Sequence, residues 1–209
     1  MSKARAKKVR LVLFDVDGVL TDGKIWIFPA PAGIKQTVEG HLSQHEDEGG
    51  FGFVGQTSMI EAKGFHAHDG TAISLARLAG IRTGIITKRI SETVALRARD
   101  LKLDFVHQGI QDKRTCFEQI LKEAGLKASE VCYVGDDVID LPVMRHCGFA
   151  VAVANARDEV KREAHYVTKH SGGDGAARDA VEFILKAQGK WKKVVDEYVF
   201  ERSPKRQSN

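Results

Sequence analysis

The stretch from Val9 to Gly23 limits what this chain can fold into more than any other. Its apolar run, Val9 to Phe14, is long enough for a buried strand and too short for a helix. The run leads into Asp15 and Asp17, whose side chains should project from one face if the strand continues through them. Two carboxylates at the end of a buried strand need a positive partner, and a cation together with a phosphate group would supply one. A strand followed by an ordinary Asx-type turn is the alternative, and this stretch alone leaves both open.

Short apolar segments alternate with helical segments along the rest of the chain. This alternation predicts an α/β fold with a doubly wound parallel sheet between two layers of helices. The carboxyl ends of parallel strands share one edge, which is where binding sites form. We expect Asp69 to cap the first long helix, which Gly80 ends, and Ser91 to cap the next. The predicted strands are 9–14, 81–86, 104–107, 131–134, 149–153 and 165–168, and the predicted helices are 69–80, 91–101, 113–125, one from Asp140, 157–164 and 176–188.

The segment from 25 to 65 interrupts this alternation. Strands near 25–28 and 59–62 are expected to pair as an extended hairpin that follows the first strand, with a glycine-rich loop between them. His41 and His45 have the i, i+4 spacing of a metal pair on a helix. Glycines and acidic residues surround them, so we favour a surface loop over a metal site.

Composition limits the class of protein. The 209 residues suit a single domain at 9–189, with basic or polar tails at 1–8 and 190–209. The net charge of +4 is mild, and the basic residues lack the aromatic interleaving of a nucleic-acid surface. No apolar run reaches membrane-spanning length, and the cysteines lack a CxxC spacing. We therefore expect a cytoplasmic protein with no nucleic-acid or membrane partner and a small anionic substrate.

Polar residues at several predicted strand ends match the needs of phosphoryl transfer. Asp15 is the candidate nucleophile, and Asp17 can protonate the leaving oxygen and then activate water. Lys113 would neutralise the approaching anions, Thr87 would hydrogen-bond a phosphoryl oxygen, and Asp136 would hold Mg²⁺. Taken singly, Thr87 could be an ordinary strand-end residue and Lys113 a solvated helix-start residue. Their occurrence together at strand ends favours a phosphatase that works through an aspartyl-phosphate.

The motifs DVDGVLTDG and GDDVID, with Thr87 and Lys113 between them, resemble those of the haloacid dehalogenase superfamily. Within it, FHAHDG, QGIQDK, VAVANA and the closing GGDGAARDAVEFILKAQGKW are similar to the family of 3-deoxy-D-manno-octulosonate 8-phosphate phosphatases, which have no large cap domain. The resemblance covers about Arg10 to Gln188. It implies a Rossmann-like fold and a Mg²⁺-dependent phosphatase of lipopolysaccharide precursor synthesis, acting on a phosphorylated sugar acid.

The resemblance also implies a homotetramer in which a neighbouring subunit helps to close the active site. It implies metal ligation by Asp15, by Asp136 and by the backbone carbonyl of Asp17, with support from Asp137 and Asp140. It further implies a set of substrate-binding residues: His66, His68, Asp69, Gly70, Lys88, Arg89 and Arg97.

The chain departs from the family pattern where the sugar would be chosen. Lys88 replaces a usual glycine, His68 a usual arginine, and Asp174 a common basic residue, and the hairpin is longer. Replacing arginine with histidine removes a permanent charge and a bidentate fork. The octulosonate 8-phosphate is the first expected substrate, and a nonulosonic 9-phosphate or another sugar phosphate is the alternative. A weakly active binding or regulatory module is the alternative from another class.

Overall fold

A computed structural model of the chain describes residues 2–29 and 59–202. Six parallel strands form one sheet in the order β5-β4-β1-β6-β7-β8, which confirms the predicted α/β fold. Buried, mostly apolar residues fill the central strands, as expected where both faces of a sheet are covered. The strands are β1 Leu11–Phe14, β4 Arg82–Ile86, β5 Phe105–His107, β6 Val131–Gly135, β7 Phe149–Ala152 and β8 Tyr166–Val167.

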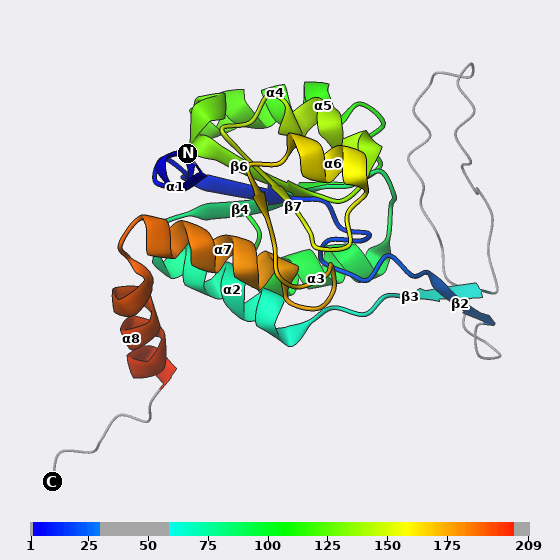
Figure 1. Ribbon diagram of the computed structural model, residues 1–209. Helices are drawn as coiled ribbons and strands as arrows, with labels where there is room; N and C mark the ends of the chain where they lie inside the picture. The colour runs from blue at the N-terminus through cyan, green and yellow to red at the C-terminus, as the bar shows by residue number, and fades with distance from the viewer. Residues whose placement is uncertain (1, 30–58, 203–209) are drawn as a thin grey trace, which may run out of the picture.

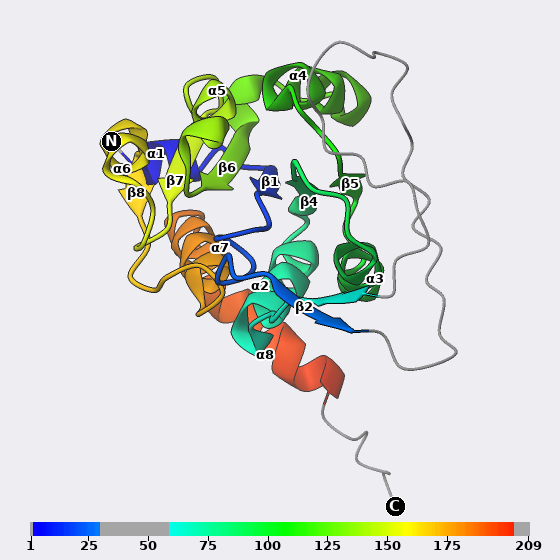
Figure 2. The same ribbon diagram turned by 90° about the vertical axis from the view of Figure 1, so that its right-hand side faces the viewer.

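Helices cover both faces of this sheet. Figure 1 shows α4, α5 and α6 on one face and α2, α3 and α7 on the other, and Figure 2 shows the same layers from the side. The longer helices are α2 Ala67–Leu78, α3 Glu92–Leu101, α4 Lys113–Ala124, α7 Ala176–Ala187 and α8 Trp191–Arg202. The shorter ones are α1 Ser2–Ala6, α5 Leu141–Met144, α6 Asp158–Glu163 and the 3₁₀ turns Ala128–Glu130 and Val138–Asp140.

The register of the central strands brings their carboxyl ends to one edge. Phe14 of β1 lies beside Ile85 of β4 on one side and Val134 of β6 on the other. The loops after these three strands therefore begin side by side. This placement puts the residues that follow β1, β4 and β6 within reach of one another, as the sequence predicts.

The predicted hairpin is confirmed. β2 (Trp26–Pro29) pairs antiparallel with β3 (Met59–Ala62), and the pair projects from the side of the molecule where β1 ends (Figure 1). The loop between the two strands, including His41 and His45, lies outside the described residues.

Both ends of the described chain, predicted as basic or polar tails, contain helices. The segment 2–6 is helical: Ala6 is buried and Ser2 Oγ donates a hydrogen bond to the His165 carbonyl oxygen at 2.6 Å. At the other end, Trp191 packs between Arg178 and Lys186, and Val194 is buried. In α8, Trp191, Val194 and Tyr198 recur at helical spacing and pack against the core, so this helix has an apolar face to bury despite its lysine-rich composition.

The cap of α2 also differs from the prediction. The helix begins earlier than Asp69, and His66 is its N-cap, with Nδ1 accepting a hydrogen bond from the His68 amide at 3.3 Å. Asp69 sits in the first turn, and its carboxylate accepts hydrogen bonds from the Gly175 and Arg178 amides at the start of α7. Asp69 therefore joins the N-termini of two helices. Ser91 is the N-cap residue of α3, but its side chain makes no capping hydrogen bond.

Candidate active site

Asp15 and Asp136 lie at the shared edge of the sheet. Asp15 directly follows β1, is almost fully buried, and accepts a hydrogen bond from the Val16 amide at 2.7 Å. Asp136 directly follows β6 and is partly buried. The strands that carry them are neighbours in register, so the two carboxylates approach each other through the parallel pairing of β1 with β6.

Lys113 is the positive group at this edge. Asp112 caps α4 by accepting hydrogen bonds from the Arg114 and Thr115 amides, which fixes Lys113 as the first helical residue. The Lys113 ammonium nitrogen lies 3.0 Å from Asp15 Oδ1 and 2.8 Å from Asp140 Oδ1. All three side chains are buried, so one lysine serves two carboxylates in a poorly solvated site.

Asp140 organises the loop after β6. Its Oδ1 accepts hydrogen bonds from Lys113 and from the Tyr133 hydroxyl, the latter at 2.8 Å. Its Oδ2 accepts from the backbone amides of Asp136 and Asp137 at 2.9 and 3.3 Å. Both oxygens are therefore engaged, and Asp140 holds the neighbouring groups in place. Asp137 itself caps the following 3₁₀ turn, accepting a hydrogen bond from the Val138 amide at 2.7 Å.

The carboxylates outnumber the positive charge here, and the titration of the site reflects this. Burial, followed by repulsion from Asp140, raises the pKa of Asp15 to about 7 despite the opposing effect of Lys113. Burial and the charges of Asp140, Asp15 and Asp137 likewise raise the pKa of Asp136 to about 7. Burial alone would lower the pKa of Lys113, but Asp140 and Asp15 outweigh it and raise that pKa. A further positive charge would relieve this repulsion.

Asp15, Asp136 and Asp140 each offer a ligand oxygen within 4.8 Å of the others. Asp136 Oδ1 is buried and, among the described residues, has no hydrogen-bond partner. A buried orphan carboxylate oxygen is costly unless a cation meets it. An all-carboxylate set of this kind suits a hard cation such as Mg²⁺ better than a soft one.

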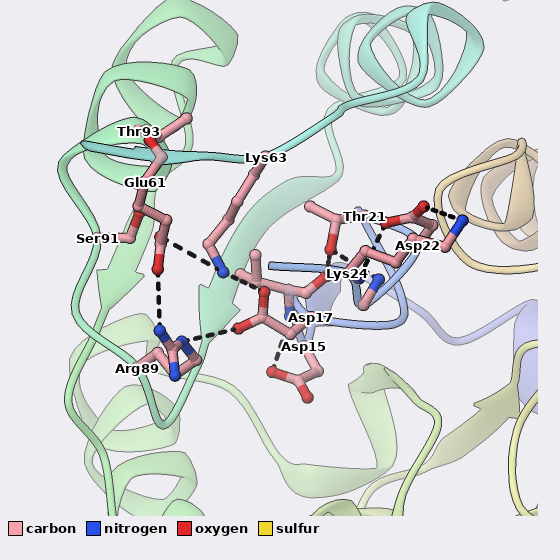
Figure 3. Close-up of polar contacts among 12 residues, drawn as sticks. Asp15, Asp17, Thr21, Asp22, Lys24, Glu61, Lys63, Arg89, Ser91 and Thr93 are labelled. Atoms are coloured by element: carbon pink, nitrogen blue, oxygen red, sulfur yellow. Dashed lines mark hydrogen bonds and ion pairs between the residues drawn. The ribbon is translucent and has the colours of Figure 1, made fainter. Parts of the chain in front are cut away.

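The Asp17 carboxylate has partners of its own, Lys63 and Arg89. β1 ends at Phe14, so strand alternation does not extend through Asp17. Asp15 contacts Lys113, whereas the Asp17 carboxylate is turned toward Lys63 and Arg89 (Figure 3). The prediction that strand alternation places both side chains on one face is therefore wrong, because β1 ends before Asp15 and the two carboxylates have different partners. The prediction that the Asp17 backbone carbonyl binds metal stays a prediction.

Thr87 and Arg89 follow β4. Thr87 is buried, and its backbone is fixed by a hydrogen bond from its amide to the His107 carbonyl at 2.9 Å. Arg89 Nη2 lies 2.9 Å from Glu61 Oε2, which ties this loop to β3. Lys88 is exposed between them. The loop thus presents a hydroxyl and two cationic side chains beside the same edge of the sheet.

A small pocket holds most of the other predicted substrate-binding residues. The Arg97 guanidinium lies over the Phe65 ring at 5.7 Å, and its buried Nε has no hydrogen-bond partner among the described residues. A Cβ at Gly70 would lie 2.6 Å from Arg97 Nη2, so any other residue at position 70 would displace the guanidinium from its present position. His68 lies outside the pocket, edge-on to His66. The pocket is lined by Leu20, Phe65, His66, Asp69, Gly70, Ile73, Arg97 and Leu101.

The loop at 171–175 supports the loop after β1. An added Cβ at Gly172 would lie 1.7 Å from the Gly18 carbonyl oxygen, and one at Gly173 would lie 2.3 Å from the Asp22 amide. The Gly173 amide donates to the Val19 carbonyl at 3.0 Å. Asp174, one of the departures from the family pattern, lies 3.9 Å from His66 Nε2. Because Gly172 and Gly173 have no Cβ, the backbone of the loop at 171–175 can lie directly against the backbone of the loop after β1.

The structure brings together Asp15, Lys113, Asp136 and Asp140, and separately Asp17 with Arg89. Sequence reasoning missed Lys63, Glu61 and Tyr133, which contact these residues. A single lysine just after a short strand and a tyrosine in a buried strand carry no motif of their own. The only signal available was Tyr133, a polar hydroxyl in a run that must be buried.

Comparisons with known proteins give the relatives of this chain. Residues 79–178 match the haloacid dehalogenase-like hydrolase family. The chain is 35% identical over 187 residues to the 3-deoxy-D-manno-octulosonate 8-phosphate phosphatase of Escherichia coli K12, covering 90% of this chain and 85% of that protein.

Solved structures agree with this likeness. The phosphatase of that name from Moraxella catarrhalis, in complex with magnesium, phosphate and KDO (the octulosonate sugar acid), has a TM-score of 0.76 at 31% identity, covering 94% of this chain and 97% of that one. The one from Yersinia pestis has a TM-score of 0.74 at 34% identity, covering 91% of this chain and 88% of that one.

Within the part of this chain that the structure describes, no helix is both long and apolar enough to cross a membrane.

Proposed function

The chain belongs to the 3-deoxy-D-manno-octulosonate 8-phosphate phosphatase family of haloacid dehalogenase-like phosphatases, and we propose that it hydrolyses the 8-phosphate of that sugar acid with Mg²⁺. The observation that carries the proposal is the cluster of the buried Asp15 and Lys113 with the partly buried Asp136 at the carboxyl edge of the sheet. A nucleophilic carboxylate, a fixed ammonium group and a carboxylate with an unused oxygen are the groups that phosphoryl transfer requires.

Each of four side chains has a separate role in the proposed reaction. An Asp15 oxygen attacks phosphorus and forms the aspartyl-phosphate, while the sugar oxygen leaves and takes a proton from Asp17. Asp17 then takes a proton from the water that attacks the same phosphorus and frees Asp15. Lys113 keeps its charge against Asp15 throughout, and Thr87 would donate its hydroxyl hydrogen to a phosphoryl oxygen.

The residues present fit a magnesium ion. Asp15 and Asp136 would hold it with the backbone carbonyl of Asp17, and Asp140, with both oxygens occupied, would keep Asp136 and Asp137 in position. A bound Mg²⁺ neutralises negative charge on the phosphoryl group and the carboxylates. The buried Asp136 Oδ1 without a partner and the raised pKa values of Asp15 and Asp136 support this assignment.

The groups beside this cluster suit an acidic sugar. Arg89 and Lys88 stand at the end of β4, and Arg97 lies in the pocket with His66 and Gly70. We assign recognition of the substrate's sugar and carboxylate to these residues and to His68. The Asp69 carboxylate is already bound by two amides of α7, so it supports the pocket wall.

A nonulosonic 9-phosphate is the second candidate substrate. The observation that favours it is Asp174 beside His66, which adds a negative charge at a position where a basic residue is common in the family. The Asp174 carboxylate would accept a hydrogen bond from the amide N–H that a sialic-type sugar carries and the octulosonate lacks.

Mg²⁺-dependent phosphate release from a panel of purified phosphates tests the proposal. The panel contains the octulosonate 8-phosphate, a sialic-type 9-phosphate, hexose phosphates and a nucleoside monophosphate. A preference of at least about tenfold in kcat/KM for the first supports the proposed substrate, since one tenfold step is about 1.4 kcal/mol of differential transition-state binding. A preference for the 9-phosphate moves the assignment to the second candidate, and release from none of them favours a binding module.

The proposal includes a homotetramer. Trp26, Ile27 and Phe28 on β2 are all about half exposed, an apolar strip that is unusual for a free surface. A second copy of the chain covering this strip would account for it. The mass of the protein in solution, measured by light scattering, tests this part separately from the chemistry.

A further inference from the structure

Lys63 is a buried lysine next to the predicted acid–base residue. It follows β3, its side chain is 0% exposed, and its ammonium group pairs with Asp17 Oδ1. A lysine is almost never fully buried unless a charged partner compensates it. The contact therefore places a fixed, poorly solvated positive charge on one particular oxygen of Asp17.

Glu61 and Arg89 complete a ring around Asp17. Glu61 Oε1 lies 3.7 Å from Lys63 Nζ, and Glu61 Oε2 lies 2.9 Å from Arg89 Nη2. Arg89 Nε in turn lies 4.0 Å from Asp17 Oδ2 (Figure 3). Burial would raise the pKa of Glu61, but Arg89 and Lys63 are among the groups that outweigh it and hold that pKa below its usual value. Two cations and two carboxylates thus balance one another.

The two oxygens of Asp17 are not equivalent in this ring. Lys63 is buried, whereas the Arg89 side chain is 47% exposed and farther from its Asp17 oxygen. Exposed ion pairs are weakened by solvent, and buried ones are screened much less. An ammonium group has only donors, so the oxygen that accepts from Lys63 cannot also carry a proton toward it. Oδ2 is therefore the Asp17 oxygen that is left to exchange a proton.

We propose that Lys63 is a positioning residue that acts through Asp17: by occupying Oδ1, it fixes Oδ2 as the oxygen that exchanges protons with substrate and water. This inference rests on the proposed phosphatase function. In the first step the Asp15 oxygen–phosphorus bond forms, the phosphorus–sugar oxygen bond breaks, and the proton on Oδ2 moves to the leaving oxygen. In the second step Oδ2 takes a proton from the attacking water.

A purely structural role for Lys63 makes a different prediction. The same ion pair also fastens β3 of the hairpin to the loop after β1, so its loss could disturb the site in general. General disturbance lowers the rate for every substrate alike. Loss of a positioned proton donor lowers the rate only for substrates whose leaving oxygen must be protonated as the phosphorus–oxygen bond breaks.

The experiment compares two leaving groups in Lys63→Met and the wild-type enzyme. For an alkyl phosphate that the wild type hydrolyses, we expect kcat/KM to fall by about 10²-fold or more, the usual contribution of a positioned acid. For p-nitrophenyl phosphate, whose leaving group departs without protonation, we expect a fall of less than about tenfold. Because kcat/KM reports the steps up to loss of the leaving group, it isolates the first proton transfer. Lys24→Met, on an exposed lysine that pairs with Asp22, is the matched control.

An equal loss of kcat/KM on both substrates, or no loss on either, overturns the proposal while leaving the phosphatase function intact. Failure of the wild type on every phosphate would instead contradict the proposed function. If Lys63→Met melts well below the wild type, Lys63→Arg serves as the second variant, because a guanidinium keeps a cationic donor for Asp17 Oδ1. We expect Lys63→Arg to restore most of the kcat/KM on the alkyl phosphate, and a loss there as large as in Lys63→Met overturns the proposal.

Discussion

The Lys113 ammonium nitrogen lies 3.0 Å from Asp15 Oδ1, and both side chains are almost fully buried. The first residue of α4 and the first residue after β1 meet at one edge of the sheet, where Asp140 and Asp136 add further negative charge. One lysine cannot neutralise this set, and the raised pKa values of Asp15 and Asp136 follow from that excess. An additional cation would balance this negative charge and allow a phosphoryl group to approach Asp15.

Asp15→Asn should abolish turnover, because an amide cannot form the covalent phosphoryl intermediate. We expect phosphate release to fall by roughly 10⁴-fold or more, as when other covalent nucleophiles are removed. Asp100→Asn, on an exposed residue of α3, should keep the wild-type rate. More than a trace of activity in Asp15→Asn, measured with the best substrate and saturating Mg²⁺, would remove Asp15 as the nucleophile.

Lys113→Met should destabilise the fold as well as stop the reaction. Removing one partner of a buried ion pair typically costs about 3–5 kcal/mol, because the other charge is left uncompensated. We expect a loss of this size in the free energy of unfolding at pH 8, measured by urea denaturation. Lys122→Met, on an exposed lysine in the last turn of the same helix, is the control and should change stability little. Equal stabilities of the two variants would show that Lys113 is not needed to compensate the carboxylates.

Stability of the metal-free protein should depend on pH in a defined direction. The pKa of Asp15 and that of Asp136 are about 7 in the folded protein against 3.8 for an ordinary Asp, so the folded state binds more protons between these values. These groups therefore stabilise the metal-free fold at low pH, and this contribution is lost as pH rises from about 4 to about 7.

Mg²⁺ should reverse this trend, because ligand carboxylates must be ionised and the cation relieves their repulsion. We expect the rise in melting temperature on adding Mg²⁺ to be larger at pH 7.5 than at pH 5.5, as measured by differential scanning calorimetry. In Asp136→Asn the rise should be small at both values. A rise that is equal at the two pH values in the wild-type protein would contradict the assignment of the metal ligands.

Gly172→Ala should damage catalysis without touching any reacting group. Its Cβ would meet the Gly18 carbonyl oxygen at 1.7 Å, so the loop that carries Asp17 must shift. A displacement of about 1 Å at a reacting group can cost about 10²-fold in rate, which is the loss we expect in kcat/KM. Gly64→Ala, where an added Cβ meets open space, should behave like the wild type. If the two variants have the same kcat/KM, the close approach of the loops does not position the site.

The sequence by itself determined the parallel α/β fold and the residues at the ends of its strands. Hydrophobic periodicity is a local property, so the strands, the hairpin and the helices at 113–124 and 176–187 can be predicted from neighbouring residues. The placement of Asp15 and Asp136 at one edge follows from the parallel topology that this alternation requires. The helix at the C-terminal end escaped prediction because its short apolar stripe of Trp191, Val194 and Tyr198 lies among many charged residues.

Tertiary structure alone decided the partners of each charged group. Asp15 and Asp17 are two residues apart in the sequence, yet one pairs with Lys113 from α4 and the other with Lys63 beyond β3. Long-range contacts, burial and the ending of β1 at Phe14 produce this division, and none of them is encoded in local spacing. Two carboxylates that look equivalent in the motif differ in the fold, because burial and the distance to a cationic partner set the chemical role of each.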